Sequence, residues 1–180
     1  MPTTALRRRH DIAHRATIAR PMTAPAHPLL AELDQLFAQP GAAPWDAVLA
    51  RLLRHFDCPV GTVHLIEPKD GLLHLAAQRG LPPQVLDKVG LIPIGKGMAG
   101  IAAERREPVQ MCNLQTDASG VARPNAKLTR MEGSIAAPML REGKLYGVIG
   151  VAKPVAYDFT TAETELLLAV GRELSRHLPR

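Results

Sequence analysis

The glycine-rich turn at residues 95–100 has the residue types best suited to binding chemistry. It reads Gly95-Lys96-Gly97-Met98-Ala99-Gly100 and opens a predicted helix, Met98–Arg105. Glycines let the backbone bend sharply and approach a ligand closely. The first amides of a helix carry the positive end of its dipole, and Lys96 adds a mobile cation. The turn therefore predicts an anion or carbonyl site, with a packing turn that holds no ligand as the alternative.

A long polar loop, Asn113–Met131, follows the turn in the sequence. A loop of this length inside a compact domain is usually functional, as a lid or a binding loop. We expect the loop and the strand after it to close over the turn, although some of the apolar positions also suit a packed core. The predicted ligand-binding residues are Ile94, Lys96, Gly97, Met98, Ala99, Gly100, Ile101, Asn113, Thr116, Met131 and Ser134.

Two histidines, His64 and His74, lie on the two arms of a predicted hairpin. If residue 66 pairs with residue 72, the two imidazoles face each other within about 5 Å. Such a pair can hold a metal ion or a haem edge. The pattern contains no third ligand, so we expect a structural or solvent-facing pair with neither metal nor haem. We expect no other cofactor.

The chain has two cysteines, Cys58 and Cys112. Two are too few for a disulfide scaffold or a cysteine-rich zinc module. A thiol redox enzyme needs a nucleophilic cysteine and a resolving partner, and the two cysteines lie at the ends of different predicted elements. This cysteine usage predicts a reducing compartment, the cytoplasm.

Composition excludes several classes of protein. The 180 residues suffice for one domain, and the 46% hydrophobic and 22% charged residues are typical of a globular chain. Only 3% of the residues are aromatic, which argues against a base-stacking surface for nucleic acid. No apolar run approaches the length of a membrane-spanning helix. We therefore expect neither a nucleic acid nor a membrane as partner.

The net charge of +5 is concentrated in an N-terminal arm, residues 1–25. This arm has five arginines against Asp11 alone and no helical periodicity. It suits a phosphate-gripping arm, a targeting peptide or a disordered tail upstream of a true start at Met22. We expect the disordered tail, with one domain over residues 26–180.

Hydrophobic periodicity and turn residues predict the elements that would position these groups. Helices are predicted over residues 27–38, 44–56, 82–89, 98–105 and 160–178, the last opened by a capping box from Thr160 to Glu163. Strands are predicted over residues 60–67, 72–78, 91–94, 108–111, 134–140 and 144–152. Hairpins without βαβ crossovers imply an α+β fold with an antiparallel sheet of about six strands.

With its elements in this order, the sequence resembles a GAF domain, a small-ligand sensing module. The segments that carry the resemblance are Ile94–Ala103, Pro108-Val109, Gly133–Met139, Gly147–Val151 and Phe159–Glu163. The resemblance implies a central antiparallel sheet with the terminal helices on one face. On the other face it implies a ligand pocket under short helices and loops.

The resemblance also bears on catalysis. Free methionine-R-sulfoxide reductase is an enzyme of this family that needs cysteines near the glycine turn and in the loop before the Ser134 strand. Those places hold other residues here, around Ala99 and Lys127. We therefore expect a protein that is not an enzyme, and keep a redox enzyme using Cys112 as an alternative.

The predicted function is that of a free-standing GAF sensor for a polar or anionic metabolite, nitrate-like anions included. It would act through a signalling protein such as a histidine kinase or a transcription regulator. A structural dimerisation module with a degenerate pocket is the other alternative. We expect a homodimer, because leucines of the first and last helices exceed what one sheet face needs. These residues are Leu29, Leu33, Leu36, Leu167, Leu174 and Leu178.

Overall fold

The computed structural model describes residues 27–122 and 124–179, so the predicted arm of residues 1–25 lies outside the described residues. The described helices are α1 (Pro28–Phe37), α2 (Trp45–Phe56), α3 (Pro83–Val89), α4 (Gly97–Arg105), α5 (Pro124–Lys127) and α6 (Thr161–Arg176). The strands are β1 (Val60–Ile66), β2 (Leu73–Arg79), β3 (Leu91–Ile92), β4 (Val109–Met111), β5 (Ser134–Arg141) and β6 (Lys144–Ala152). None of these helices is both long and apolar enough to cross a membrane.

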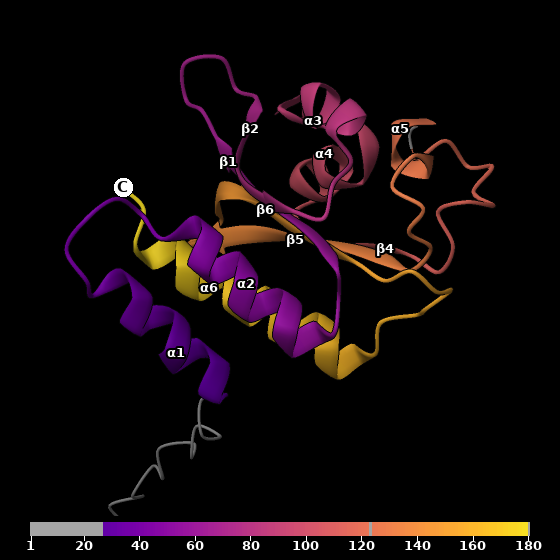
Figure 1. Cartoon of the computed structure of the whole chain (residues 1–180). Helices are drawn as coiled ribbons and strands as arrows, with labels where there is room; N and C mark the ends of the chain where they lie inside the picture. The colour runs from indigo at the N-terminus through magenta and orange to yellow at the C-terminus, as the bar shows by residue number, and fades with distance from the viewer. Residues whose placement is uncertain (1–26, 123, 180) are drawn as a thin grey trace, which may run out of the picture.

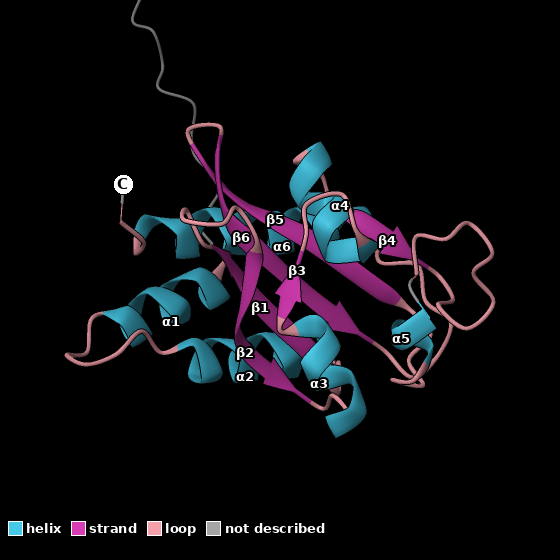
Figure 2. Cartoon of the chain, turned by 90° about the horizontal axis from the view of Figure 1, so that it is seen from above, coloured by secondary structure: helices cyan, strands magenta, loops and turns pink. Residues whose placement is uncertain are grey.

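The six strands form one antiparallel sheet in the order β3-β2-β1-β6-β5-β4. The hairpins β1–β2 and β5–β6 lie side by side, joined through β1 and β6 (Figure 2). The α+β fold class and the six-stranded sheet predicted from the sequence are confirmed.

The helices divide between the two faces of the sheet (Figure 1). On one face, α2 packs on β1 and β2 while α6 packs on β5 and β6, and α1 lies against both helices. On the other face, α4 packs on β4, β5 and β6, α3 follows into the edge strand β3, and α5 contacts α3. The predicted loop over residues 113–131 therefore contains one short helix, α5.

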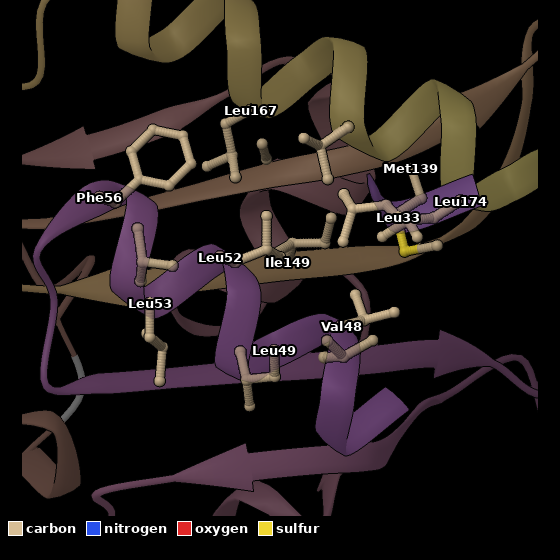
Figure 3. Close-up of a cluster of buried hydrophobic side chains, with 14 of the residues drawn as sticks. Leu33, Val48, Leu49, Leu52, Leu53, Phe56, Met139, Ile149, Leu167 and Leu174 are labelled. Atoms are coloured by element: carbon tan, nitrogen blue, oxygen red, sulfur yellow. The ribbon is translucent and has the colours of Figure 1, made fainter. Parts of the chain in front are cut away.

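Large aliphatic side chains fill the space between the sheet and the helices α1, α2 and α6 (Figure 3). The buried members from these helices include Leu33, Leu49 and Leu167, and the sheet contributes Met139 and Ile149. Each is fully buried, which stabilises the fold by about 1.5–3 kcal/mol per side chain relative to exposure. This layer is the main hydrophobic core.

Polar contacts satisfy the C-terminus of α2 and the N-terminus of α6. The Lys153 ammonium donates to the carbonyl oxygens of Phe56, at 2.5 Å, and Asp57, at 3.1 Å, which lie at the C-terminus of α2. Thr160 and Glu163 form the predicted capping box at the start of α6. Two helix ends thereby obtain partners for backbone groups that helical geometry leaves unpaired.

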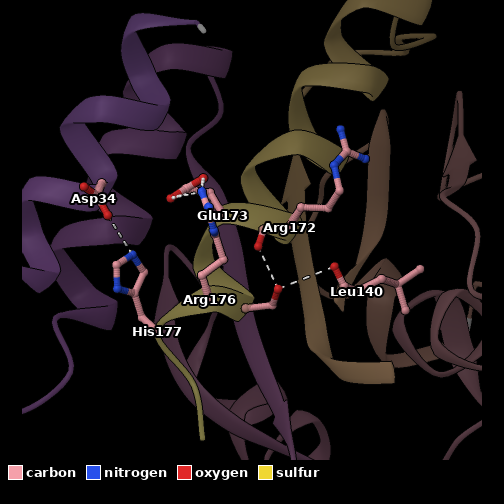
Figure 4. A network of polar contacts seen from close by, with 7 residues as sticks. Asp34, Leu140, Arg172, Glu173, Arg176 and His177 are labelled. Carbon is pink, nitrogen blue, oxygen red and sulfur yellow. Dashed lines mark hydrogen bonds and ion pairs between the residues drawn. The ribbon is translucent and has the colours of Figure 1, made fainter. Parts of the chain in front are cut away.

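Helix α1 is held against the end of α6 by an aromatic stack and by a contact between His177 and the Asp34 carboxylate, which Figure 4 shows. The ring of His177 stacks on Phe37 at a centroid distance of 4.3 Å, and its Nε2 lies 3.1 Å from Asp34 Oδ1. The leucines from which a homodimer was expected serve this packing instead. Of these, Leu29, Leu33, Leu167 and Leu174 are buried within the single chain, while Leu36 and Leu178 are half-buried against the core. Most of the apolar surface that motivated the dimer is thus buried inside one chain, and the homodimer itself stays a prediction.

Gly171 of α6 marks the closest approach of that helix to the sheet. A Cβ at this position would lie 2.8 Å from the carbonyl oxygen of Pro138, a backbone atom of β5. Alanine favours a helix over glycine by about 1 kcal/mol, yet here it would force α6 away from β5. We expect Gly171→Ala to lower the free energy of unfolding by about 1–3 kcal/mol in urea unfolding. The exposed neighbour Arg172→Ala is the control, and a Gly171→Ala variant as stable as that control would contradict the contact.

Candidate functional site

A cavity of about 190 Å³ lies on the sheet face opposite the main core. Its floor is formed by β1, β5 and β6, and its walls come from α3, α4, α5 and the loop that precedes α5. The residues that line the cavity include Thr62, His64, Lys88, Lys96, Gly97, Met98, Ala99, Ser134, Ala136, Gly150 and Ala152. A dry apolar cavity of roughly 150 Å³ takes a benzene ring, so this cavity has room for an organic molecule.

The cavity exists because the side chains on this face of the central strands are small. Ala136 of β5 lies beside Gly150 of β6, and Ala152 continues the same strand. A second, smaller hydrophobic cluster of Leu73, Ala136 and Val148 packs against α4 next to the cavity. Short side chains on the sheet thus hold α4 close while leaving the adjoining space unfilled.

The first turn of α4 contributes positive electrostatic potential to the cavity. Gly97, Met98 and Ala99 line it, and the N-cap residue Lys96 makes no side-chain capping bond. Gly97 and Gly95 have φ angles of 63° and 78°, which suit glycine, so the turn before the helix depends on these two residues. An anion in the cavity would meet helix amides that lack intrahelical partners.

The charged side chains among the described lining residues are all positive. Lys88 and Lys96 are exposed lysines of the lining, and no aspartate or glutamate is found among the described residues that line the cavity. Together with the helix dipole of α4, these cations favour a negatively charged ligand.

His64 is the buried polar side chain of the cavity floor, with 1% of its surface exposed. Its Nε2 lies 2.8 Å from the carbonyl oxygen of Val89, which only accepts hydrogen bonds, so Nε2 carries the proton. Burial lowers the pKa of this imidazole, while the bond to Val89 acts in the opposite direction more weakly. The ring is therefore neutral, and its Nδ1 is buried without a partner.

The cavity brings together some of the residues predicted to bind a ligand and leaves others outside. Lys96, Gly97, Met98, Ala99 and Ser134 line it. The remaining predicted residues, Ile94, Gly100, Ile101, Asn113, Thr116 and Met131, are absent from the described lining. Which of these groups contact a ligand stays a prediction.

The predicted residues outside the lining either face solvent or contact other parts of the protein. Ile94 and Thr116 face solvent. Asn113 donates to Glu132 and accepts from the amide of Gln115, which shapes the loop rather than the cavity. Gly100 lies so near the Pro93 carbonyl oxygen that a Cβ would come within 2.3 Å of it. Sequence reasoning assigned Ile94 and Gly100 to the site because they neighbour the glycine turn, and Asn113 and Thr116 because the loop over residues 113–131 was expected to close over it.

The expected pairing of His64 with His74 is wrong. His64 pairs with Leu75 and His74 with Leu65, because Ile66 pairs with Leu73 rather than with residue 72. Neighbouring residues of a strand point to opposite faces, so the two imidazoles lie on opposite sides of the sheet. His74 is half-exposed and contacts Asp70 at 2.8 Å, while His64 lies in the cavity floor.

Sequence reasoning missed the contributions of His64, Thr62 and Lys88. The alternation of Thr62 and His64 with Val63 along β1 is a signal that could have placed both on one face. Lys88 lies on α3, a helix whose position over the sheet depends on tertiary packing. No sequence motif marks this part of the site.

Both cysteines are free and lie outside the cavity lining. Burial raises the pKa of the Cys58 thiol to about 11. Desolvation and the nearby Asp158 carboxylate raise the pKa of exposed Cys112. Since the thiolate is the reactive form, neither environment activates its cysteine at neutral pH.

A third group of titratable residues lies at the contact of α1 with α6, far along the chain from the cavity lining. Ligand atoms of Asp34, Glu173 and His177 lie within 4.8 Å of one another, a spacing that could suit a cation. Glu173 already pairs with the Arg176 guanidinium at 3.1 Å, and His177 stacks on Phe37. These contacts account for the cluster as a support for α1.

The neutral state of His64 predicts how the stability of the folded protein depends on pH. Its pKa in the folded state lies below the ordinary value of about 6.5, so below that pH the unfolded chain binds a proton that the folded chain does not. Its stabilising contribution is therefore complete above about pH 6.5 and is lost as the pH falls. Between pH 7.5 and 5.5 we expect the wild type to lose more stability than His64→Gln, with an extra slope of at most about 1.4 kcal/mol per pH unit. Urea unfolding at several pH values measures it, and parallel curves would contradict it.

Comparison with known proteins shows to which family the chain belongs. A family model described as GAF domain matches residues 45–178, most of the chain. No curated protein matches the chain. The solved structures that it resembles have sequence identities near 20%, so they establish the fold alone.

Three of these structures illustrate the range. The GAF domain of an Acinetobacter phosphoenolpyruvate-protein phosphotransferase has a TM-score of 0.69 and 20% identity over 83% of this chain and 89% of that chain. A free methionine-R-sulfoxide reductase from Neisseria meningitidis, in complex with its substrate, has a TM-score of 0.68 and 18% identity over 83% and 85%. The Staphylococcus aureus structure named fRMsr, also with substrate, has a TM-score of 0.66 and 22% identity over 84% and 94%.

The family match extends over more than two thirds of the chain, and the sheet order and helix placement agree with those solved structures. The chain belongs to the GAF domain family.

Proposed function

We propose that this chain is a regulatory sensor that binds a small organic anion in the cavity between the sheet and the helices α3, α4 and α5. The observation that carries the proposal is the lining itself: apolar walls, two lysines and a helix N-terminus, with no carboxylate among the described lining residues. Membership of a family of sensory and regulatory domains supports the same function.

The size and polarity of the cavity favour an organic ligand over a simple inorganic anion. A nitrate-like ion would fill a small part of about 190 Å³ and would leave the apolar walls without contacts. An organic anion instead places its apolar body against side chains such as Val85, Val89 and Ala152 and its charge near Lys88 and Lys96. Small metabolites with one carboxylate or phosphate group fit this description.

A redox enzyme like the reductases among the similar structures is the second candidate, and the thiols argue against it. Such chemistry needs an activated thiolate beside the substrate. Cys58 and Cys112 lie outside the lining and have raised pKa values. We therefore propose binding rather than catalysis as the role of the cavity.

The signal would pass to another protein, for example a histidine kinase or a transcription regulator. A homodimer in the cytoplasm remains part of the proposal. Free Cys58 and Cys112 suit a reducing compartment.

Removing the cations should weaken anion binding. We expect amino acids, keto acids, aromatic acids and nucleotides, screened by thermal shift, to include organic anions that raise the melting temperature. Lys88→Ala and Lys96→Ala should each weaken the best of these by about 2- to 10-fold, the effect of a partly exposed charge. The loss should shrink as salt is added, because salt screens the exposed lysines.

Lys69→Ala is the matched control, since this lysine is exposed on the β1–β2 turn, outside the lining. Calorimetry of the three variants with the best anion measures the differences. Stabilisation by no organic anion, or an equal loss in Lys69→Ala, would contradict the proposed sensor and favour a structural module.

A further inference from the structure

One row of the cavity floor places a hydroxyl group beside a position that has no side chain. Thr62 of β1 pairs with Gly150 of β6, and Gly150 pairs with Ala136 of β5. All three residues line the cavity. Their strand neighbours Val63 and Ile149 belong to the main core, so this row faces the cavity.

The Thr62 hydroxyl leans over Gly150. A Cβ on Gly150 would lie 3.2 Å from Oγ1 of Thr62, closer than to the carbonyl oxygen of Ile135 at 3.9 Å. Gly150 is not among the glycines with a positive φ angle, so no left-handed backbone requires a glycine there. Its absent side chain instead leaves a space in the floor, which we call the floor notch, and Oγ1 of Thr62 forms one wall of this notch.

The hydroxyl of Thr62 is accessible and has no hydrogen-bond partner among the described residues. Its side chain is half-buried. Two side-chain atoms of the described residues are buried without a partner, Nδ1 of His64 and Nε2 of His177, and Oγ1 of Thr62 is neither of them. An oxygen that is unpartnered yet not buried is open to the cavity that Thr62 lines. A molecule in the cavity can therefore reach Oγ1.

The other two hydroxyl groups of the described lining already have partners inside the protein. The Thr129 hydroxyl donates to the Ala126 carbonyl oxygen at 2.6 Å and accepts from the Met131 amide at 3.2 Å. The Ser134 hydroxyl donates to the Val151 carbonyl oxygen in a longer hydrogen bond of 3.4 Å. Thr62 is thus the lining residue whose hydroxyl is left for a ligand.

The charged end of an organic anion belongs at the mouth of the cavity rather than in the floor notch. Lys88 and Lys96 are exposed, and the amides of the first turn of α4 follow Lys96. Around Thr62 the floor presents Ala136 and Ala152, where a carboxylate would lose its hydration without meeting a cation. A neutral group therefore matches Thr62. A threonine hydroxyl both donates and accepts, so a hydroxyl or a carbonyl group meets this requirement.

Thr62 also disfavours an apolar group in the same place. A hydroxyl that is open to solvent bonds to water. A methyl group over Oγ1 would displace that water and leave the hydroxyl unpaired, which lowers affinity. Sites built around a polar group reject analogues that lack its partner more strongly than apolar sites reject a change in size.

We propose that the floor notch of Thr62 and Gly150 is the specificity-determining subsite of the cavity, and that it binds a neutral hydroxyl or carbonyl group at the far end of an organic anion. The inference rests on the proposed function, because it concerns the same cavity. It names the ligand class: a carboxylate or phosphate near the lysines, an apolar body, and an uncharged oxygen at the opposite end. Acids of the same shape that end in a methyl group bind less well.

The acids 4-hydroxyphenylacetate and 4-methylphenylacetate test this subsite, because they differ only in the group opposite the carboxylate arm. Thr62→Val replaces the hydroxyl by a methyl group, and valine suits a strand. We expect Thr62→Val to weaken binding of the hydroxy acid by about 3- to 10-fold, as one hydrogen bond requires. The methyl acid should bind unchanged or up to about 5-fold more tightly, because the unpaired hydroxyl is gone. Calorimetry at pH 7.5 measures both affinities.

Two further variants separate the hydroxyl from the shape of the side chain. Thr62→Ser retains the hydroxyl and should retain the preference for the hydroxy acid. Thr116→Val is the matched control, since this threonine faces solvent outside the lining, and it should change neither affinity. If valine is not tolerated at position 62, Thr62→Ala compared with Thr62→Ser repeats the test.

Equal changes for the two acids in Thr62→Val would overturn the inference, as would the absence of binding of both acids to the wild type at millimolar concentration. A loss of preference in Ser134→Ala with none in Thr62→Val would overturn it as well. The organic anions of the thermal-shift screen separate the two proposals. If they bind with a dependence on Lys88 and Lys96 while Thr62→Val leaves the preference unchanged, the sensor stands and the subsite fails; if no organic anion binds, both fail.

Discussion

The size difference between side chains on the two faces of the central strands is the constraint on which the rest of the structure depends. Facing α1, α2 and α6, the strands present residues such as Met139 and Ile149, which pack with the helix leucines into a closed core. Facing α3, α4 and α5, they present Ala136, Gly150 and Ala152, which cannot fill the space beneath those helices. Stability is thereby concentrated in one layer, and the other layer is left with room for a ligand.

The polar groups of the cavity follow from how short elements end above that open face. The glycine turn before α4 directs the positive end of the helix into the cavity, and α3 brings Lys88 and the Val89 carbonyl oxygen over the sheet. The regular pairing of β1 with β6 places His64 on the cavity face, where its Nε2 meets Val89. The cations and the apolar floor of the cavity thus come from separate elements.

Sequence patterns were sufficient for the fold because they are local. Helical spacing, turn residues and the Thr160–Glu163 capping box predict the elements, and the glycine turn predicts that the start of α4 lines a site. The role of His64 could not be read from spacing alone, since its contact with Val89 at the end of α3 is a tertiary property. Ile94, next to the turn, and Asn113, in the loop expected to cover it, were placed in the site although neither lines the cavity. Most of the leucines read as a dimer surface are buried within the chain because α1 packs across α2 and α6, and that packing is a tertiary property.

Two alanines in the central strands test the difference between the faces directly. Ala137 of β5 belongs to the closed core, whereas Ala152 of β6 lines the cavity. Valine suits a strand in either place, so the added methyl groups report the space around each Cβ. In urea unfolding we predict that Ala137→Val costs about 1–3 kcal/mol by overpacking, while Ala152→Val changes stability by less than about 0.5 kcal/mol. Equal losses in the two variants, or a larger loss for Ala152→Val, would show that both faces are packed alike and would contradict the cavity as a binding site.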